Sequence, residues 1–96
     1  MSPSLSPEDF ERLGEAELTL SAGERRLIAR IAEVRRMATP DAPDRHGFSV
    51  LFRTADTDPV AQQIFRVEHP ELGAHDLFLV PLGPVGGQFR YEAVFT

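Results

Sequence analysis

Apolar and polar residues alternate along most of this chain, in short runs that turn-forming residues separate. The clearest run is FRYEAVF, from Phe89 to Phe95, in which every second residue is aromatic or alanine. A period of two is typical of a β-strand with one buried face. The chain is therefore predicted to be mostly β.

The same pattern places six strands, joined by segments rich in Gly, Pro and Asp. The expected strands cover residues 16–20, 24–37, 48–53, 64–69, 77–82 and 89–95. For the second segment, residues 24–37, the pattern fits either a strand or a helix. Leu27, Ile31 and Val34 fit one face of a helix, whereas Leu27, Ala29 and Ile31 fit an alternating strand. The neighbouring turn residues favour the strand, and a helix is the alternative.

An aromatic-rich face runs through these strands and has to be buried. It comprises Phe48, Phe52, Phe65, Phe78, Phe89, Tyr91 and Phe95. Short connections make consecutive strands antiparallel neighbours, and a single open sheet would leave this face in water. We therefore expect a small antiparallel six-stranded meander rolled into a barrel or half-barrel, filled by side chains rather than by a ligand.

A short helix is predicted before the first strand. Ser6-Pro7-Glu8-Asp9 supplies a capping Ser, a Pro at the first helical position and acids in the first turn. We expect this helix to span about 7–13 and to plug one end of the core. Residues 1–6 are expected to be a disordered N-terminus, and residues 7–96 a single domain with an exposed loop at 38–47.

The charge balance excludes some partners. Fifteen acidic residues outnumber ten basic ones, for a formal net charge of −5. This charge repels the phosphates of nucleic acids and anionic lipid surfaces, so we expect no nucleic-acid partner. No apolar run approaches the ~18 residues of a spanning helix, and we see no basic and apolar secretion signal, so we expect a cytoplasmic protein without membrane contact.

The sequence shows no arrangement typical of an enzyme. The chain has no Cys, and the Gly83–Gly87 segment lacks the Lys and the helix of a phosphate-binding loop. Ser49, His46 and Asp44 could be drawn as a triad, but no strand–turn–helix motif surrounds the Ser. We therefore expect no enzymatic activity and no cofactor.

A second group of polar residues lies around one predicted hairpin. It consists of Glu68, His69, Glu71, His75 and Asp76, with His46 from the long loop as a further neighbour. His46, His69 and His75 are the candidate metal ligands, because imidazole and carboxylate groups bind Zn²⁺ or Mn²⁺. The alternative is that Glu68 and His69 bond the turn backbone before Pro70.

Five segments resemble a bacterial family of domains of unknown function, about one hundred residues long. They are Asp9-Phe10 with Leu13, Phe48–Phe52, Gln62 through Glu68-His69-Pro70 to Leu72-Gly73, Leu77–Pro81 with Gly83, and Tyr91–Phe95. The chain departs from the family pattern at Gln63, where Gly is frequent, and at Thr96, where Asn is frequent. The resemblance implies no catalytic residue. Some members of the resembled family are encoded near phage-tail-collar-like proteins. The resemblance therefore suggests a partner in a phage-tail-like structure.

These observations favour a non-enzymatic protein-interaction or assembly module, either a monomer or a homodimer. The last strand is the expected contact edge, available for pairing with a partner or a second copy. Its contact residues would be Phe89, Tyr91, Val94 and Phe95. The alternative function is a small-ligand or metal-binding domain that uses the three histidines.

Overall fold

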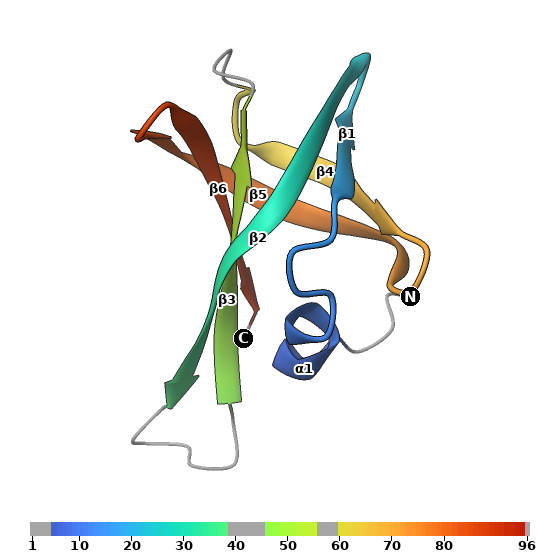
Figure 1. The fold of residues 1–96 in the computed structure, drawn as a ribbon, viewed down its shortest axis with the longest axis vertical. Helices are drawn as coiled ribbons and strands as arrows, with labels where there is room; N and C mark the ends of the chain where they lie inside the picture. Colours follow the sequence, from blue (N-terminus) through green and yellow to red (C-terminus); the bar gives the residue numbers. More distant parts are fainter. Residues whose placement is uncertain (1–4, 39–45, 56–59, 96) are drawn as a thin grey trace.

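The computed structural model describes residues 5–38, 46–55 and 60–95 (Figure 1). Within these residues, one helix, α1 (Pro7–Glu11), is followed by six strands. The strands are β1 (Leu18–Ala22), β2 (Arg25–Ala38), β3 (His46–Thr54), β4 (Gln63–His69), β5 (Gly73–Val85) and β6 (Gln88–Phe95).

The six strands are antiparallel and close into a barrel in the order β1-β2-β3-β6-β5-β4. The predicted fold class, a small β-barrel with a short N-terminal helix, is confirmed. The strand order differs from a simple meander, because β3 pairs with β6 and β4 pairs with β1. Strands β1–β3 form one meander and β4–β6 another, and the fourth strand returns beside the first, which is a Greek-key arrangement.

Strand β2 settles the open choice between helix and strand for residues 24–37. It pairs with β1 on one side and with β3 on the other. The register shifts between Ile31 and Glu33, so that one extra residue stands in β2 at this point. A bulge of this kind moves the next core-facing position from 33 to 34. The helix-like spacing of Ile31 and Val34 is therefore the sequence signature of a β-bulge.

The barrel interior is filled by large side chains from all six strands. The largest that are fully buried include Tyr91, Phe52, Phe65, Leu20 and Leu79. The Tyr91 hydroxyl accepts a hydrogen bond of 3.0 Å from the backbone N–H of Val60. This bond satisfies a buried donor in the connection before β4 and holds that connection against the core.

Helix α1 closes one end of the barrel, as predicted, and it ends at Glu11 rather than at the predicted residue 13. Phe10 is fully buried, and its ring lies 6.1 Å from Phe48, 6.4 Å from Phe52 and 5.6 Å from Phe95. The Ser6–Asp9 capping box starts the helix, with Asp9 Oδ2 accepting from the Ser6 backbone at 2.9 Å. Five helical residues are too few to be stable alone, so the burial of Phe10 is what keeps α1 in place.

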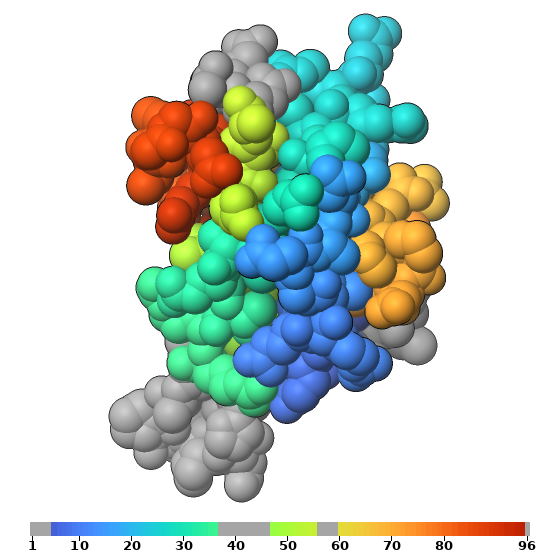
Figure 2. Space-filling model, viewed as in Figure 1, coloured from blue at the N-terminus to red at the C-terminus, as the bar shows by residue number. Residues whose placement is uncertain are grey.

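Ion pairs fasten the N-terminal segment to the outside of the barrel. In Figure 2 the blue segment that contains α1 and β1 lies along the teal strand β2. Arg36 on β2 contacts Glu8 at 3.2 Å and Glu11 at 2.6 Å. The hydrogen bonds that Arg36 donates to Glu8 and Glu11 raise the pKa of Arg36. Each of these exposed pairs is weak, and together they orient the helix.

Several predicted boundaries and one predicted core residue need correction. Phe78 points away from the core and is 54% exposed, because Leu77 and Leu79 take the inward positions of β5. The predicted loop at 38–47 is shorter, since Ala38 belongs to β2 and both His46 and Gly47 to β3. Its remaining residues, 39–45, lie outside the described ones.

Residues 1–6 are predicted to be disordered, and residues 1–4 of this segment lie outside the described residues. Leu5 packs against the core and Ser6 caps α1, so these two are ordered. Among the helices of the described residues, none has the length and apolar character to cross a membrane.

Candidate functional site

The three candidate metal ligands lie at two places in the fold. His69 ends β4 and His75 lies on β5 of the same hairpin, whereas His46 starts β3 opposite Ala38. Figure 1 shows the start of β3 at the lower end of the barrel, away from the β4–β5 turn at the right. Within residues 5–38, 46–55 and 60–95, no group of three His, Asp or Glu side chains could hold a metal ion.

Both hairpin histidines bond the backbone of the turn between them. His69 Nδ1 accepts a 3.0 Å hydrogen bond from the Glu71 N–H. His75 Nε2 lies 2.7 Å from the Leu72 carbonyl oxygen and donates to it, since a carbonyl only accepts. These contacts match the structural alternative for His69, in which the side chain stabilises the turn before Pro70.

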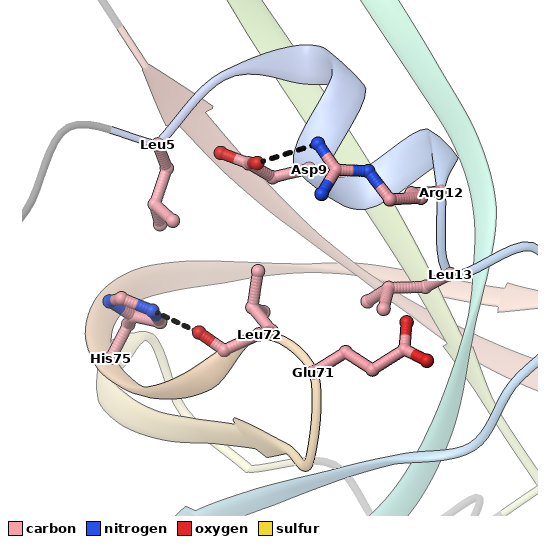
Figure 3. Close-up of a pocket in the computed structure, with 7 residues that line it drawn as sticks. All are labelled: Leu5, Asp9, Arg12, Leu13, Glu71, Leu72 and His75. Atoms are coloured by element: carbon pink, nitrogen blue, oxygen red, sulfur yellow. Dashed lines mark hydrogen bonds and ion pairs between the residues drawn. The ribbon is translucent and has the colours of Figure 1, made fainter.

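A pocket of 220 Å³ separates α1 from the β4–β5 turn (Figure 3). Asp9, Arg12, Glu71 and His75 line it, together with Leu5, Leu13 and Leu72. Asp9 caps α1 and contacts Arg12 at 3.3 Å, and His75 Nε2 bonds the turn, whereas His75 Nδ1 is buried without a hydrogen-bond partner among the described residues. In Figure 3 the Glu71 carboxylate points away from His75.

The capping role of Asp9 has an electrostatic consequence. Hydrogen bonds from the backbone and side chain of Ser6 lower the pKa of Asp9, with a smaller contribution from the charges of Arg12 and His75. A carboxylate that accepts hydrogen bonds in its charged form is stabilised in that form. The charged Asp9 therefore supports the folded start of α1.

The Ser–His–Asp arrangement drawn from the sequence is not assembled by the described residues. Ser49 lies on the outer face of β3, opposite Arg35 and Val94, and is almost fully buried there. Asp44 and the side chain of His46 lie outside what the structure describes. Nothing in the surroundings of Ser49 resembles a nucleophile on a sharp turn.

The prediction that β6 is an interaction edge is wrong for most of the strand. β6 pairs with β3 along Phe89–Phe95 and with β5 along Gln88–Glu92. Phe89 and Tyr91 are core residues, because barrel closure turns their side chains inward. Phe95 is partly buried against the core, where its ring stacks on Phe48 at 4.4 Å. Only Val94, at 55% exposure, faces solvent as an interaction residue would.

β5 changes its partner along its length, and this opens a groove. Residues 73–79 of β5 pair with β4, and residues 80–85 pair with β6. Among the described residues, no β5 partner is present for Ala93–Phe95 of β6. A groove of 120 Å³ lies at this point, lined by Leu77, Phe78, Val80, Glu92, Ala93, Val94 and Phe95.

Exposed apolar side chains surround this groove. Phe78 and Val94 line it, and Ile64 on β4 is the cross-strand neighbour of Phe78. Their exposures are 62% for Ile64, 54% for Phe78 and 55% for Val94. We call these three residues the apolar patch. Exposed apolar residues are ordinary singly, but a contiguous group on one sheet face is typical of an interaction surface.

The apolar patch was only partly visible in the sequence. Residues 77–82 are apolar at nearly every position, which indicated apolar residues on both faces of the strand, and this is what β5 shows. From the sequence alone, this pattern predicts either a central strand or a strand at which the sheet curls over itself. In a small closed barrel only one face of each strand is inside, so the second apolar face lies at the surface.

Comparisons with known proteins add a family and no function. A family model described as "Domain of unknown function (DUF6916)" matches residues 5–95. The match covers every described helix and strand. No curated protein and no solved structure matches the chain.

Proposed function

Since the chain belongs to the DUF6916 family of domains of unknown function, we propose a function from its own surface: a non-enzymatic protein-interaction or assembly module. The carrying observation is the apolar patch, Ile64, Phe78 and Val94, beside the groove between β5 and β6. Its partner is another protein or a second copy of this chain. Its setting in a phage-tail-like bacterial structure stays a prediction from the family resemblance.

The patch fits this role because of how the barrel is built. The core is already filled by side chains such as Phe52, Phe65 and Tyr91, so the outward Ile64 and Phe78 add nothing to it. Burying such side chains against a partner gains about 25 cal/mol for each Å² of apolar area. Aromatic residues are enriched at the centres of protein interfaces, which suits the position of Phe78.

The rigid frame around the patch also supports the proposal. Ile64 and Phe78 lie opposite each other on β4 and β5. These two strands pair continuously, from Gln63 opposite Leu79 to His69 opposite Gly73. Because the backbone of paired strands is already ordered, binding a partner here requires little further backbone ordering.

The proposal is tested with substitutions in the patch and a matched control elsewhere on the barrel. Ile64→Asp and Phe78→Asp introduce a charge in the patch, and Ile28→Asp introduces the same charge on β2, where Ile28 is 52% exposed. Native mass spectrometry of protein purified gently from its own host reads out subunit number and retained partners. We expect the patch variants to lose the partner or second copy and Ile28→Asp to keep it.

Two further readouts make the outcome unambiguous. Circular dichroism of all three variants should match that of the unsubstituted chain, because each replaced side chain lies on the outer face. If the patch variants keep the same associations as the control, the patch is not the interaction surface and the proposal is wrong.

A further inference from the structure

Three arginines form a row across the outer face of the barrel. Arg30 on β2 is registered opposite Arg53 on β3, and Arg53 is registered opposite Arg90 on β6. The neighbours of these residues, such as Phe52 and Tyr91, face the core, so the arginines face outward. Like charges directly opposite each other on a sheet repel, and acidic groups are needed to offset the repulsion.

The N-terminal segment supplies acidic groups to two of the three arginines. Glu15 contacts Arg53 at 2.8 Å, and Glu17 contacts Arg30 at 3.2 Å. For Arg90, no ion pair joins it to another of the described residues. Its Nε atom is buried and has no hydrogen-bond partner. A buried charged donor without a partner is costly, which marks Arg90 as a group that lacks its acceptor.

Arg90 as a whole is only partly buried, so an acceptor in the open space beside it would reach the end of the guanidinium group rather than the buried Nε. The neighbour of Arg90 on β5 is Gly83, which has no side chain, and no atom lies within 4 Å of the point that a Cβ would occupy there. Leu82 and Val85, on the same stretch of β5, are about half exposed. Arg90 therefore stands beside open space with an apolar rim, a setting suited to a protein segment rather than to a free anion.

Arg90 is also in line with the apolar patch. Arg90, Glu92 and Val94 share the outer face of β6, and four residues of strand place Arg90 about 13 Å from Val94. Glu92, between them, makes no ion pair with any residue that the structure describes. Its charge does act on Arg35 of β2, whose pKa is raised first by the hydrogen bond to Glu33 and further by Glu92. Along this line the surface is apolar, then acidic, then basic.

We propose that an extended segment of a protein partner lies along this line, with an apolar side chain on Val94 and Phe78, a basic one at Glu92 and a carboxylate at Arg90. This inference rests on the proposed function and adds the chemistry of the partner. The partner pattern is apolar-x-basic-x-acidic in either chain direction, because alternate residues of an extended segment face the same side. Opposite charges at matching positions give the register.

Short synthetic peptides test the pattern. The designed peptides carry the cores VTKTE and ETKTV, one for each direction, and the controls VTETK and KTETV exchange the two charges without changing composition or net charge. Each is titrated to millimolar concentration into the ¹⁵N-labelled full chain, and the side-chain Nε–Hε signal of Arg90 is followed by NMR. We expect one designed peptide to shift this signal saturably and to bind about tenfold more tightly than its control.

A variant of the protein with the two charges exchanged tests whether these charges determine which peptide binds more tightly. Arg90→Glu together with Glu92→Arg should invert the preference, so that the control peptide binds more tightly. Arg26→Glu, at an exposed arginine on β2, should leave the preference unchanged. Equal binding of designed and control peptides, a preference that does not invert, or no response of Arg90 would each overturn the inference.

The same spectra separate this inference from the proposed function. If both peptide types perturb Phe78 and Val94 equally, the apolar patch binds protein segments and only the charge pattern is wrong. If the charge preference holds while Phe78 and Val94 do not respond, the apolar patch is not part of the binding surface, and the proposed function of the patch is wrong.

Discussion

Single residues show how this barrel meets its internal hydrogen-bonding needs. Tyr91 is fully buried, and its hydroxyl is the acceptor for the Val60 N–H. Tyr91→Phe keeps the ring and leaves that donor unpaired, so we expect a loss of about 1–3 kcal/mol in the free energy of unfolding. This loss is measured by urea denaturation, as a shift of the midpoint at an unchanged m-value. An unchanged midpoint would mean that the bond contributes nothing to stability.

The ionisation of Asp9 is a second effect at this scale. Its pKa is lowered in the folded state by Ser6, so its contribution to stability is complete above the pKa of an unfolded Asp, about 3.9. That contribution is lost as the pH falls through the lower, folded pKa. We expect the amide protection factors of α1, taken relative to the intrinsic exchange rate at each pH, to fall as the pH falls through this range, and Asp9→Asn to remove most of that fall. An identical pH profile for Asp9→Asn would contradict the role of the cap.

Among the elements, α1 depends most on one contact. Phe10→Ala removes the ring that packs on Phe48, Phe52 and Phe95, and such core truncations cost about 3–5 kcal/mol. Phe78→Ala deletes the same atoms from a side chain that is 54% exposed, and we expect it to cost much less. Thermal unfolding of the two variants compares them directly. Similar losses for both would mean that Phe10 does not plug the barrel.

The elements also show where sequence reasoning succeeds. Alternation is local, so the strands and the capped start of α1 could be predicted from neighbouring residues such as Ser6 and Asp9. The bulge in β2 made Ile31 and Val34 look helical, because one extra residue changes the local period. The outward direction of Phe78 could not be predicted, since an apolar strand has no marked face.

At the scale of the whole molecule, strand order is set by contacts far apart in the sequence. The β3–β6 pairing places Phe48 opposite Phe95 and Phe52 opposite Tyr91, which no local pattern specifies. That pairing buries the strand predicted to be an edge and leaves the apolar patch as the exposed surface. The candidate site is therefore a product of topology, whereas the barrel class follows from local alternation and from the need to bury the aromatic-rich face.

The central claim, that the apolar patch binds a protein, is tested most directly by site-specific photocrosslinking in the host cell. A benzoyl-phenylalanine at position 78 lies in the patch, and one at position 28 lies on β2 at similar exposure. We predict a discrete protein adduct from position 78 that disappears with Ile64→Asp and does not form from position 28. The same adducts from both positions, or none from position 78, would contradict the account.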